Sequence, residues 1–245
     1  MLGESHAGRL RAVGARLAYR HEGLTMKEEY VTARNLDQKA REWLKLVDVR
    51  PSRREKFRFD LGTAALLVLD MQEYFLNEAS HAFVPASRAI LPNVKRLIEQ
   101  FRMAGRPVVY TRHSLEAGDD PGIMGRWWRD IVREGTKESA IAKLLDVSGG
   151  DVVIRKTRYS AFEGTILEEL LRERGADSLA ITGVTTHLCC DSTARDAFMQ
   201  DFTVFLVVDA TASWTEELHL SSLRILADGF AIPVMTDDLV SARRP

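Results

Sequence analysis

Cys189 is the residue whose type and setting point most directly to chemistry. It ends the block Gly183-Val-Thr-Thr-His-Leu-Cys189, which follows the apolar, β-capable run at residues 179–182 and opens a helical pattern through Ala194 and Phe198. The first backbone N–H groups of a helix and the positive end of its dipole favour a thiolate, which is a nucleophile. The alternative is a small buried apolar side chain, the commonest role of a free cysteine.

Two charged residues occupy the same kind of position as Cys189. Asp70 ends the apolar run at residues 64–69, and Lys156 follows the run at residues 151–155. In an open parallel sheet, sites form beyond the carboxyl ends of the strands, where the strand order reverses. These side chains can therefore meet as a proton acceptor, an ammonium partner and a nucleophile. Taken singly, the aspartate could be a helix cap or turn residue, and the lysine a solvated side chain.

The pattern from residue 63 onward predicts the elements that must position these residues. Strands are expected at residues 64–69, 107–111, 151–155, 179–182, 202–208 and 232–235, and helices at 90–103, 138–145, 165–174, 189–198 and 216–228. An irregular insert is expected between the second strand and the second helix, at residues 115–129. Strands that alternate with helices form βαβ units. We predict an α/β fold: a three-layer α/β/α sandwich with a parallel sheet of about six strands, in the order 3-2-1-4-5-6.

The chain is long enough for one domain and an extension. We assign residues 1–60 to a charged N-terminal extension and residues 61–245 to a domain with its own core. A linker is expected at residues 51–60. The extension carries one helical apolar stripe, expected to dock on the body or on a neighbouring subunit. The stripe consists of Leu36, Ala40, Trp43, Leu44 and Val47.

Composition limits the partners and the compartment. The 34 Lys and Arg residues nearly balance the 35 Asp and Glu residues, so no overall field is expected to recruit nucleic acid or an anionic membrane. No apolar run approaches the ~18 residues of a transmembrane helix. The two cysteines, Cys189 and Cys190, are adjacent and poorly placed to pair, which favours a reducing compartment. Because the start lacks the apolar core of a secretory signal, we expect a cytoplasmic protein.

Three blocks of sequence resemble the isochorismatase-like cysteine hydrolase superfamily, which includes nicotinamidases, N-carbamoylsarcosine amidohydrolases, ureidoacrylate hydrolases and isochorismatases. The resemblance covers residues 62 to about 240. It rests on Leu66-Leu-Val-Leu-Asp-Met-Gln72, on Lys156-Thr-Arg-Tyr-Ser-Ala-Phe162, and on Gly183-Val-Thr-Thr-His-Leu-Cys189 with Ser192-Thr-Ala-Arg-Asp-Ala197. Three blocks in this order and spacing are more specific than any one of them alone.

The resemblance implies a role for each reactive residue: Asp70 as general base, Lys156 as its partner and Cys189 as nucleophile. It also implies a cis peptide bond between Val184 and Thr185, which would turn the Thr185 N–H toward the Cys189 N–H to form an oxyanion hole. The expected reaction is hydrolysis of a C–N bond in a small linear amide, carbamoyl or ureido substrate. A thioester on Cys189 is expected as the intermediate, ammonia or an amine is released, and no cofactor takes part.

Two branches of the superfamily leave alternatives open. Isochorismatases resemble this chain closely but carry glycine at the position of Cys189, and they cleave a vinyl ether with the aspartate as acid. Cys189 favours C–N hydrolysis; the alternatives are a vinyl-ether hydrolase that uses Asp70, or a non-catalytic family member. Nicotinamidases carry an Asp-x-His pair and a further histidine after the first strand. Here His81 stands alone and His113 follows another strand, so we predict no catalytic metal, and nicotinamidase activity is disfavoured.

Residues near the strand ends are expected to contact the substrate. They are Gln72, Phe75, His113, Trp127, Tyr159, Phe162 and His187. Trp127 and Trp128 could close over a small flat acyl group, or pack in a dimer interface; Cys190 has no role that we can assign. The expected partner is a small molecule, and the apolar helix faces predict a homodimer or homotetramer. The acyl group, the leaving group and the pathway stay open.

Overall fold

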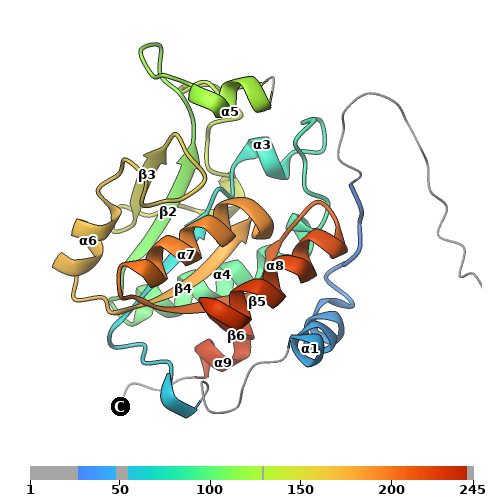
Figure 1. Ribbon diagram of the computed structural model, residues 1–245, viewed down its shortest axis with the longest axis vertical. Helices are drawn as coiled ribbons and strands as arrows, with labels where there is room; N and C mark the ends of the chain where they lie inside the picture. Colours follow the sequence, from blue (N-terminus) through green and yellow to red (C-terminus); the bar gives the residue numbers. More distant parts are fainter. Residues whose placement is uncertain (1–26, 48–54, 129, 242–245) are drawn as a thin grey trace, which may run out of the picture.

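The computed structural model describes residues 27–47, 55–128 and 130–241, which form a three-layer α/β/α sandwich (Figure 1). The six strands of its sheet are all parallel and follow the order β3-β2-β1-β4-β5-β6, as predicted. Every residue of β1 and β4 is buried, as is typical of strands covered by helices on both faces. The strands are β1 (Ala64–Leu69), β2 (Val108–His113), β3 (Val152–Lys156), β4 (Ser178–Val184), β5 (Thr203–Ala212) and β6 (Ile232–Val234).

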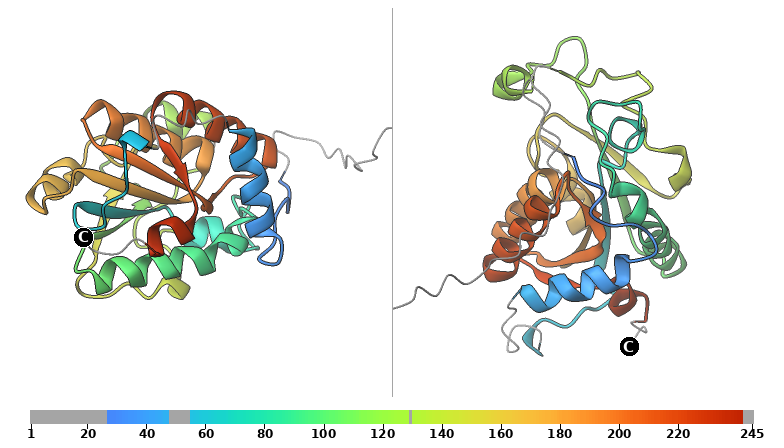
Figure 2. Two further views of the ribbon diagram at one scale, coloured as in Figure 1. Left: turned by 90° about the horizontal axis from the view of Figure 1, so that it is seen from below. Right: turned by 90° about the vertical axis from the view of Figure 1, so that its right-hand side faces the viewer.

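Helices cover both faces of the sheet, as two further views show (Figure 2). On one face α4 (Ser87–Met103) packs against β1, β4 and β5, with α9 (Thr236–Val240) beside it. On the other face lie α6 (Leu167–Glu173), α7 (Asp191–Met199) and α8 (Glu216–Gly229). Within the described ranges, no helix is both long and apolar enough to span a membrane.

The helix predicted at residues 138–145 is wrong except for a 3-10 turn at Lys143–Leu145. The N–H of Glu73, in the short helix α3 (Glu73–Leu76), donates to the carbonyl oxygen of Ala140 at 3.0 Å. Residues 138–142 therefore give their backbone groups to the chain that follows β1. Those groups are not available for helical hydrogen bonds, and this long-range pairing overrides the local helical pattern.

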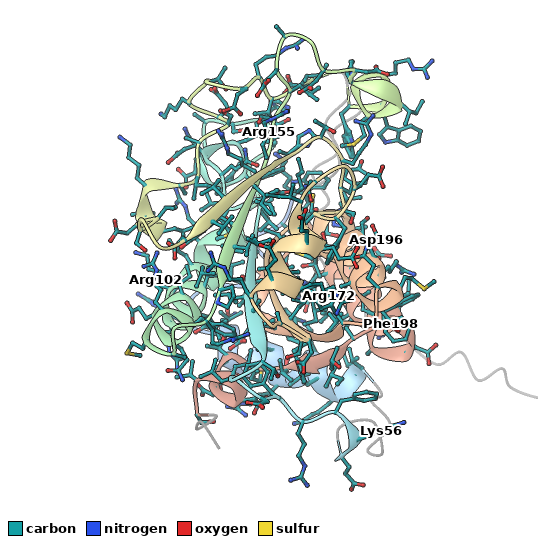
Figure 3. All side chains as sticks on the ribbon, turned by 90° about the vertical axis from the view of Figure 1, so that its left-hand side faces the viewer. Lys56, Arg102, Arg155, Arg172, Asp196 and Phe198 are labelled. Carbon is teal, nitrogen blue, oxygen red and sulfur yellow. The ribbon has the colours of Figure 1, made fainter. Side chains whose placement is uncertain are left out.

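The insert between β2 and β3 is tied to the edge of the sheet. It contains a short helix, α5 (Gly122–Trp127), where the sequence predicts irregular chain. Figure 3 labels Arg155, on the edge strand β3, and Arg102, on α4. Arg155 donates to Oδ2 of Asp119 in this insert at 2.5 Å. Arg102 donates to Oδ1 of Asp151, just before β3, at 3.1 Å. These bonds connect the insert and α4 to β3.

The amphipathic helix predicted before the domain is α1 (Leu36–Leu46), and it docks on the body of its own chain. Trp43 is buried, and its indole N–H donates to Oε1 of Glu216 at the start of α8, at 2.8 Å. Its ring meets that of His219 edge to face, with centroids 4.7 Å apart. The division at residue 60 stays a prediction, because residues 1–26 and 48–54 lie outside the described residues.

Candidate active site

Lys156 stands between the other two reactive residues at the carboxyl ends of the strands. Its Nζ lies 2.7 Å from Oδ2 of Asp70 and 3.5 Å from Sγ of Cys189. It also donates to the carbonyl oxygen of Arg158 at 3.0 Å. The side chains of Asp70 and Lys156 are fully buried. The ammonium thus has one ion-pair partner and two hydrogen-bond acceptors, which allows its charge to remain in a dry interior.

Asp70 is held in place from two strands. It follows β1 with a φ of 50°, in the left-handed region that aspartate adopts more readily than most residues. Thr111 of the neighbouring strand β2 donates its hydroxyl to Oδ1 of Asp70 at 2.7 Å, and accepts the N–H of Asp70 at 3.2 Å. The carboxylate therefore has one oxygen on Thr111 and the other beside Lys156, which restricts its rotation.

The turn after β4 carries Cys189. The peptide bond between Val184 and Thr185 is cis, and a π-helical turn, Thr186–Cys190, leads directly into α7. Thr185 and Cys189 line the same pocket. The assignment of their N–H groups to an oxyanion hole stays a prediction. Cys190, the last residue of this turn, is fully buried in the core.

The protonation of Cys189 differs from what its place at the start of a helix favours. Burial raises the pKa of the Cys189 thiol to about 12, the negative charge of Asp70 raises it as well, and Lys156 opposes both. Burial and Asp70 thus oppose the effect of the helix start, and they favour the thiol over the thiolate in the free protein. For Lys156, burial alone would lower the pKa, but the nearby Asp70 and Cys189 outweigh burial and raise it.

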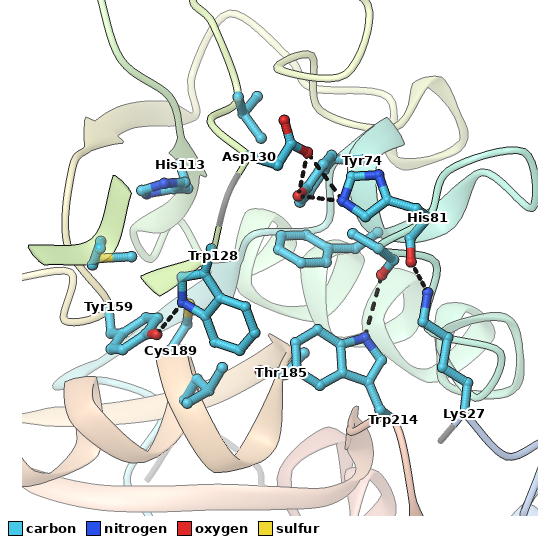
Figure 4. Close-up of a pocket in the computed structure, with 15 residues that line it drawn as sticks. Lys27, Tyr74, His81, His113, Trp128, Asp130, Tyr159, Thr185, Cys189 and Trp214 are labelled. Atoms are coloured by element: carbon cyan, nitrogen blue, oxygen red, sulfur yellow. Dashed lines mark hydrogen bonds and ion pairs between the residues drawn. The ribbon is translucent and has the colours of Figure 1, made fainter. Parts of the chain in front are cut away.

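A cavity of about 160 Å³ opens in front of Cys189 (Figure 4). Its wall is largely aromatic. The indole N–H of Trp128 donates to the hydroxyl of Tyr159, and the rings of Trp128 and Trp214 lie 5.8 Å apart. The lining residues are Lys27, Tyr74, Phe75, His81, Ala82, His113, Met124, Trp128, Asp130, Val132, Tyr159, Thr185, Leu188, Cys189 and Trp214.

Three of the seven predicted substrate contacts line this pocket: Phe75, His113 and Tyr159. His113 has no hydrogen-bond partner for Nδ1, and burial lowers its pKa to about 4, with a smaller contribution from the positive charge of Lys156. It is therefore a neutral imidazole at pH 7.

Gln72 and Phe162 lie outside the wall of the pocket. Gln72 is fully buried; its side chain accepts the N–H of His113 at 2.7 Å and donates to the carbonyl of Ser139 at 3.0 Å. It therefore connects the end of β2 to the segment near α3. The ring of Phe162 packs against that of Phe202, 5.9 Å away, within the core.

The other two predicted contacts, Trp127 and His187, also lie outside the pocket wall. Trp127 is 72% exposed, and its neighbour Trp128 lines the pocket instead. In a short helix adjacent residues point in different directions, so the tandem pair could not be resolved from sequence. His187 instead pairs through Nδ1 with the hydroxyl of Ser213, at 2.9 Å.

Several residues of the pocket wall were not predicted from the sequence. Trp214 follows the end of β5, and the strand-end rule that selects Cys189 would also have selected it. Asp130 lies 3.0 Å from Nε2 of His81 and accepts the hydroxyl of Tyr74 at 3.0 Å. Lys27 comes from before α1 and had no sequence signal. Among the residues described, no group of three His, Cys, Asp or Glu side chains could hold a metal ion.

The layered fold, with a buried acid, lysine and cysteine at one edge of a parallel sheet, defines a class of hydrolases. The profile of the Isochorismatase domain matches residues 64–238, so the chain belongs to the isochorismatase family. This confirms the resemblance that the three sequence blocks indicate.

Relatives with different names are similar to this chain. The chain is 42% identical to "Nicotinamidase 3" of Arabidopsis thaliana over 179 residues, which cover 72% of this chain and 86% of that protein. It is 34% identical to "Enterobactin synthase component B" of Escherichia coli over 196 residues, 80% of this chain and 68% of that one. The crystal structure of N-carbamoylsarcosine amidase from Thermoplasma acidophilum is similar with a TM-score of 0.63 and 30% identity, covering 71% and 97% of the two chains.

Proposed function

We propose that this protein is a cysteine amidohydrolase that cleaves the C–N bond of a small linear amide, carbamoyl or ureido substrate. The observation that carries the proposal is the position of Lys156, whose Nζ contacts Asp70 at 2.7 Å and Cys189 at 3.5 Å. An acid, an ammonium and a thiol in contact at the base of a pocket are the parts that nucleophilic acyl transfer needs.

In the first half of the reaction, Asp70 accepts the proton of the Cys189 thiol as Sγ attacks the substrate carbonyl. A base is required because the pKa of this thiol is about 12, so almost no thiolate is present beforehand. The N–H groups of Thr185 and Cys189 stabilise the oxyanion. As the C–N bond breaks, the protonated Asp70 returns its proton to the nitrogen, and ammonia or an amine leaves.

In the second half, water hydrolyses the thioester. Asp70 takes a proton from the water as its oxygen attacks the acyl carbon, and the C–S bond breaks. The proton then returns to Sγ, which restores the thiol and releases a carboxylic acid. Throughout both halves the ammonium of Lys156 stays beside Asp70 and stabilises its negative form. The net reaction consumes one amide and one water.

Two similar proteins, a nicotinamidase and an N-carbamoylsarcosine amidase, have names that denote C–N hydrolysis, and this supports the proposal. The small aromatic cavity favours a flat acyl group. Aromatic carboxamides are therefore among the compounds to test. Nicotinamide is included, even though the chain lacks the Asp-x-His pair of nicotinamidases.

The test is ammonia release from a panel that includes nicotinamide, benzamide, N-carbamoyl amino acids and ureidoacrylate. Wild-type protein is expected to release ammonia from at least one compound, and to show an acyl adduct on Cys189 by mass spectrometry after rapid acid quench. Cys189→Ala is expected to abolish both signals, while Cys190→Ala, the matched control, keeps them. Full activity in Cys189→Ala would overturn the proposal.

A second candidate, vinyl-ether hydrolysis with Asp70 as acid, is favoured by the similarity to the "Isochorismatase" of Bacillus subtilis, which is 37% identical over 182 residues. It needs no nucleophile. Activity on isochorismate that survives Cys189→Ser and is lost in Asp70→Asn would support this candidate. A non-catalytic role would require Asp70 or Lys156 to point away from Cys189, and the contacts of Lys156 oppose it.

A further inference from the structure

The segment that precedes α1 contributes directly to the pocket. Residues 27–32 lie outside the part of the chain that matches the Isochorismatase domain, residues 64–238. Even so, Lys27 lines the cavity in front of Cys189, and its Nζ donates to the carbonyl oxygen of His81 (Figure 4). Among the residues that the structure describes, the wall of the pocket therefore includes one from outside the family domain.

The segment is held against the β5–α8 connection by backbone and side-chain bonds. The N–H of Glu28 donates to the carbonyl of Trp214 at 2.8 Å, and the N–H of Ser213 donates to the hydroxyl of Tyr30 at 3.0 Å. Tyr30 in turn packs on Trp43 of α1, with ring centroids 5.9 Å apart. Lys27 therefore projects from a backbone that α1 and the body of the domain both hold.

The charges around the pocket leave Lys27 open to an anion. Oδ2 of Asp130 already accepts a hydrogen bond from the hydroxyl of Tyr74 at 3.0 Å and lies 3.0 Å from Nε2 of His81. Lys27 donates to one backbone carbonyl, and no carboxylate among the described residues forms an ion pair with it. Partial burial lowers the pKa of Lys27, because it disfavours the charged ammonium.

Lys27 is also distinct in type among the residues of the wall. Of the described residues that line the cavity, it is the one lysine or arginine. His113 is neutral at pH 7, since its pKa is about 4. An anionic group in this pocket would thus find its strongest electrostatic partner in Lys27, and a partly dry wall strengthens such a contact.

We propose that Lys27 is a specificity-determining residue that selects substrates with a carboxylate at the end remote from the scissile amide. The inference rests on the proposed function, because it takes Cys189 as the point of attack. The cavity of about 160 Å³ limits such a substrate to a small molecule with the amide at one end and the anion at the other. The segment before the domain would then decide which amides the site at Cys189 processes.

Binding of matched probes tests this without turnover. The probes are 4-carbamoylbenzoate with its neutral match 4-carbamoylbenzamide, and succinamate with succinamide, titrated by calorimetry into protein carrying Cys189→Ala. We expect at least one anionic probe to bind at least ten-fold more tightly than its neutral match. Adding Lys27→Met is expected to remove this preference by weakening the anionic probe, and Lys27→Arg to keep it.

Lys39→Met is the matched control, because Lys39 lies nearby in α1 and pairs with Glu216, at 2.7 Å, but does not line the cavity. It is expected to keep the preference for the anionic probe. Equal affinities within both probe pairs, absence of binding by both anionic probes, or an equal loss for anionic and neutral probes in Lys27→Met would overturn the inference. Because the probes are bound and not cleaved, a preference that depends on Lys27 can stand even if no amide proves to be a substrate.

Discussion

Gly183 and Leu69 approach so closely across β4 and β1 that a Cβ on residue 183 would lie 2.0 Å from the carbonyl oxygen of Leu69. Gly183 also has a φ of 106°, which side chains rarely adopt. The chain needs this contact because β1 and β4 are adjacent, and the residues that follow them, Asp70 and Thr185, must share one site.

Gly183→Ala is therefore expected to lower the free energy of unfolding by at least ~4 kcal/mol, or to prevent folding, because backbone atoms on both strands must separate. Urea denaturation measures this. Gly105→Ala is the control: Gly105 also has a positive φ, 66°, but a Cβ added there would meet nothing within 4 Å. Its cost is expected to be about 1–2 kcal/mol, from backbone conformation alone. Similar losses in the two variants would contradict the steric argument.

Asp70 and Lys156 are expected to move the thiol pKa of Cys189 in opposite directions. Asp70→Asn removes a negative charge that raises this pKa, so the thiolate should form at lower pH. Lys156→Met removes the ammonium that lowers it, so the thiolate should form at still higher pH than in the wild type. Titration of thiolate absorbance, in a Cys190→Ala background, measures both shifts.

The same pair separates thiol reactivity from catalysis. Asp70→Asn is expected to react at least ten-fold faster with iodoacetamide at pH 8, yet to lose at least ~10³-fold in amide hydrolysis, because the proton acceptor is gone. A variant that gained both reactivity and hydrolytic rate would show that Asp70 is not the base.

His219 is expected to make the protein less stable in acid. It is fully buried, its Nδ1 pairs with the hydroxyl of Thr186 at 2.8 Å, and burial lowers its pKa to about 3. Between the unfolded pKa of about 6.5 and the folded value, the unfolded chain binds a proton that the folded protein does not. The contribution of neutral His219 to stability is thus complete above about pH 6.5, and falls as the pH is lowered toward 3.

Urea denaturation of the wild type and of His219→Asn between pH 7 and pH 4 tests this effect. The slope of unfolding free energy against pH is expected to be shallower in His219→Asn by about 1 kcal/mol per pH unit. His113 and His187, whose pKa values burial also lowers to about 4, contribute equally to both proteins. Parallel curves would mean that His219 does not titrate in this range.

Trp128 and Trp127 offer a comparison between neighbours. Trp128→Ala removes a ring that lines the cavity and holds Tyr159, and is expected to raise KM for an aromatic amide about ten-fold, as loss of one aromatic contact of about 1.4 kcal/mol would. Trp127 is 72% exposed, so Trp127→Ala should change KM less than two-fold. Steady-state kinetics with any substrate found among the amides tested measures both changes in KM. A larger change in Trp127→Ala than in Trp128→Ala would contradict the assignment of Trp128 to the pocket wall.

The substrate wall shows where prediction from sequence stops. Phe75 and Gln72 are three positions apart after the same strand, yet Phe75 lines the cavity and Gln72 is buried behind it. The direction of each side chain depends on how α3 turns, and that turn depends on hydrogen bonds to residues near Ala140, far along the chain. Sequence patterns contain the strand ends but not these directions.

The sequence by itself determined the alternation of strands and helices and the strand ends that carry Asp70, Lys156 and Cys189. These features follow from apolar runs, glycines and local motifs, which act over a few neighbouring residues. Only the tertiary structure decided that burial raises the pKa of the Cys189 thiol, that Trp128 and Trp214 line the cavity, and that Lys27 reaches the cavity from outside the family domain. Desolvation and the closing of a pocket wall depend on groups far apart in the chain, so they exist only once the chain has packed.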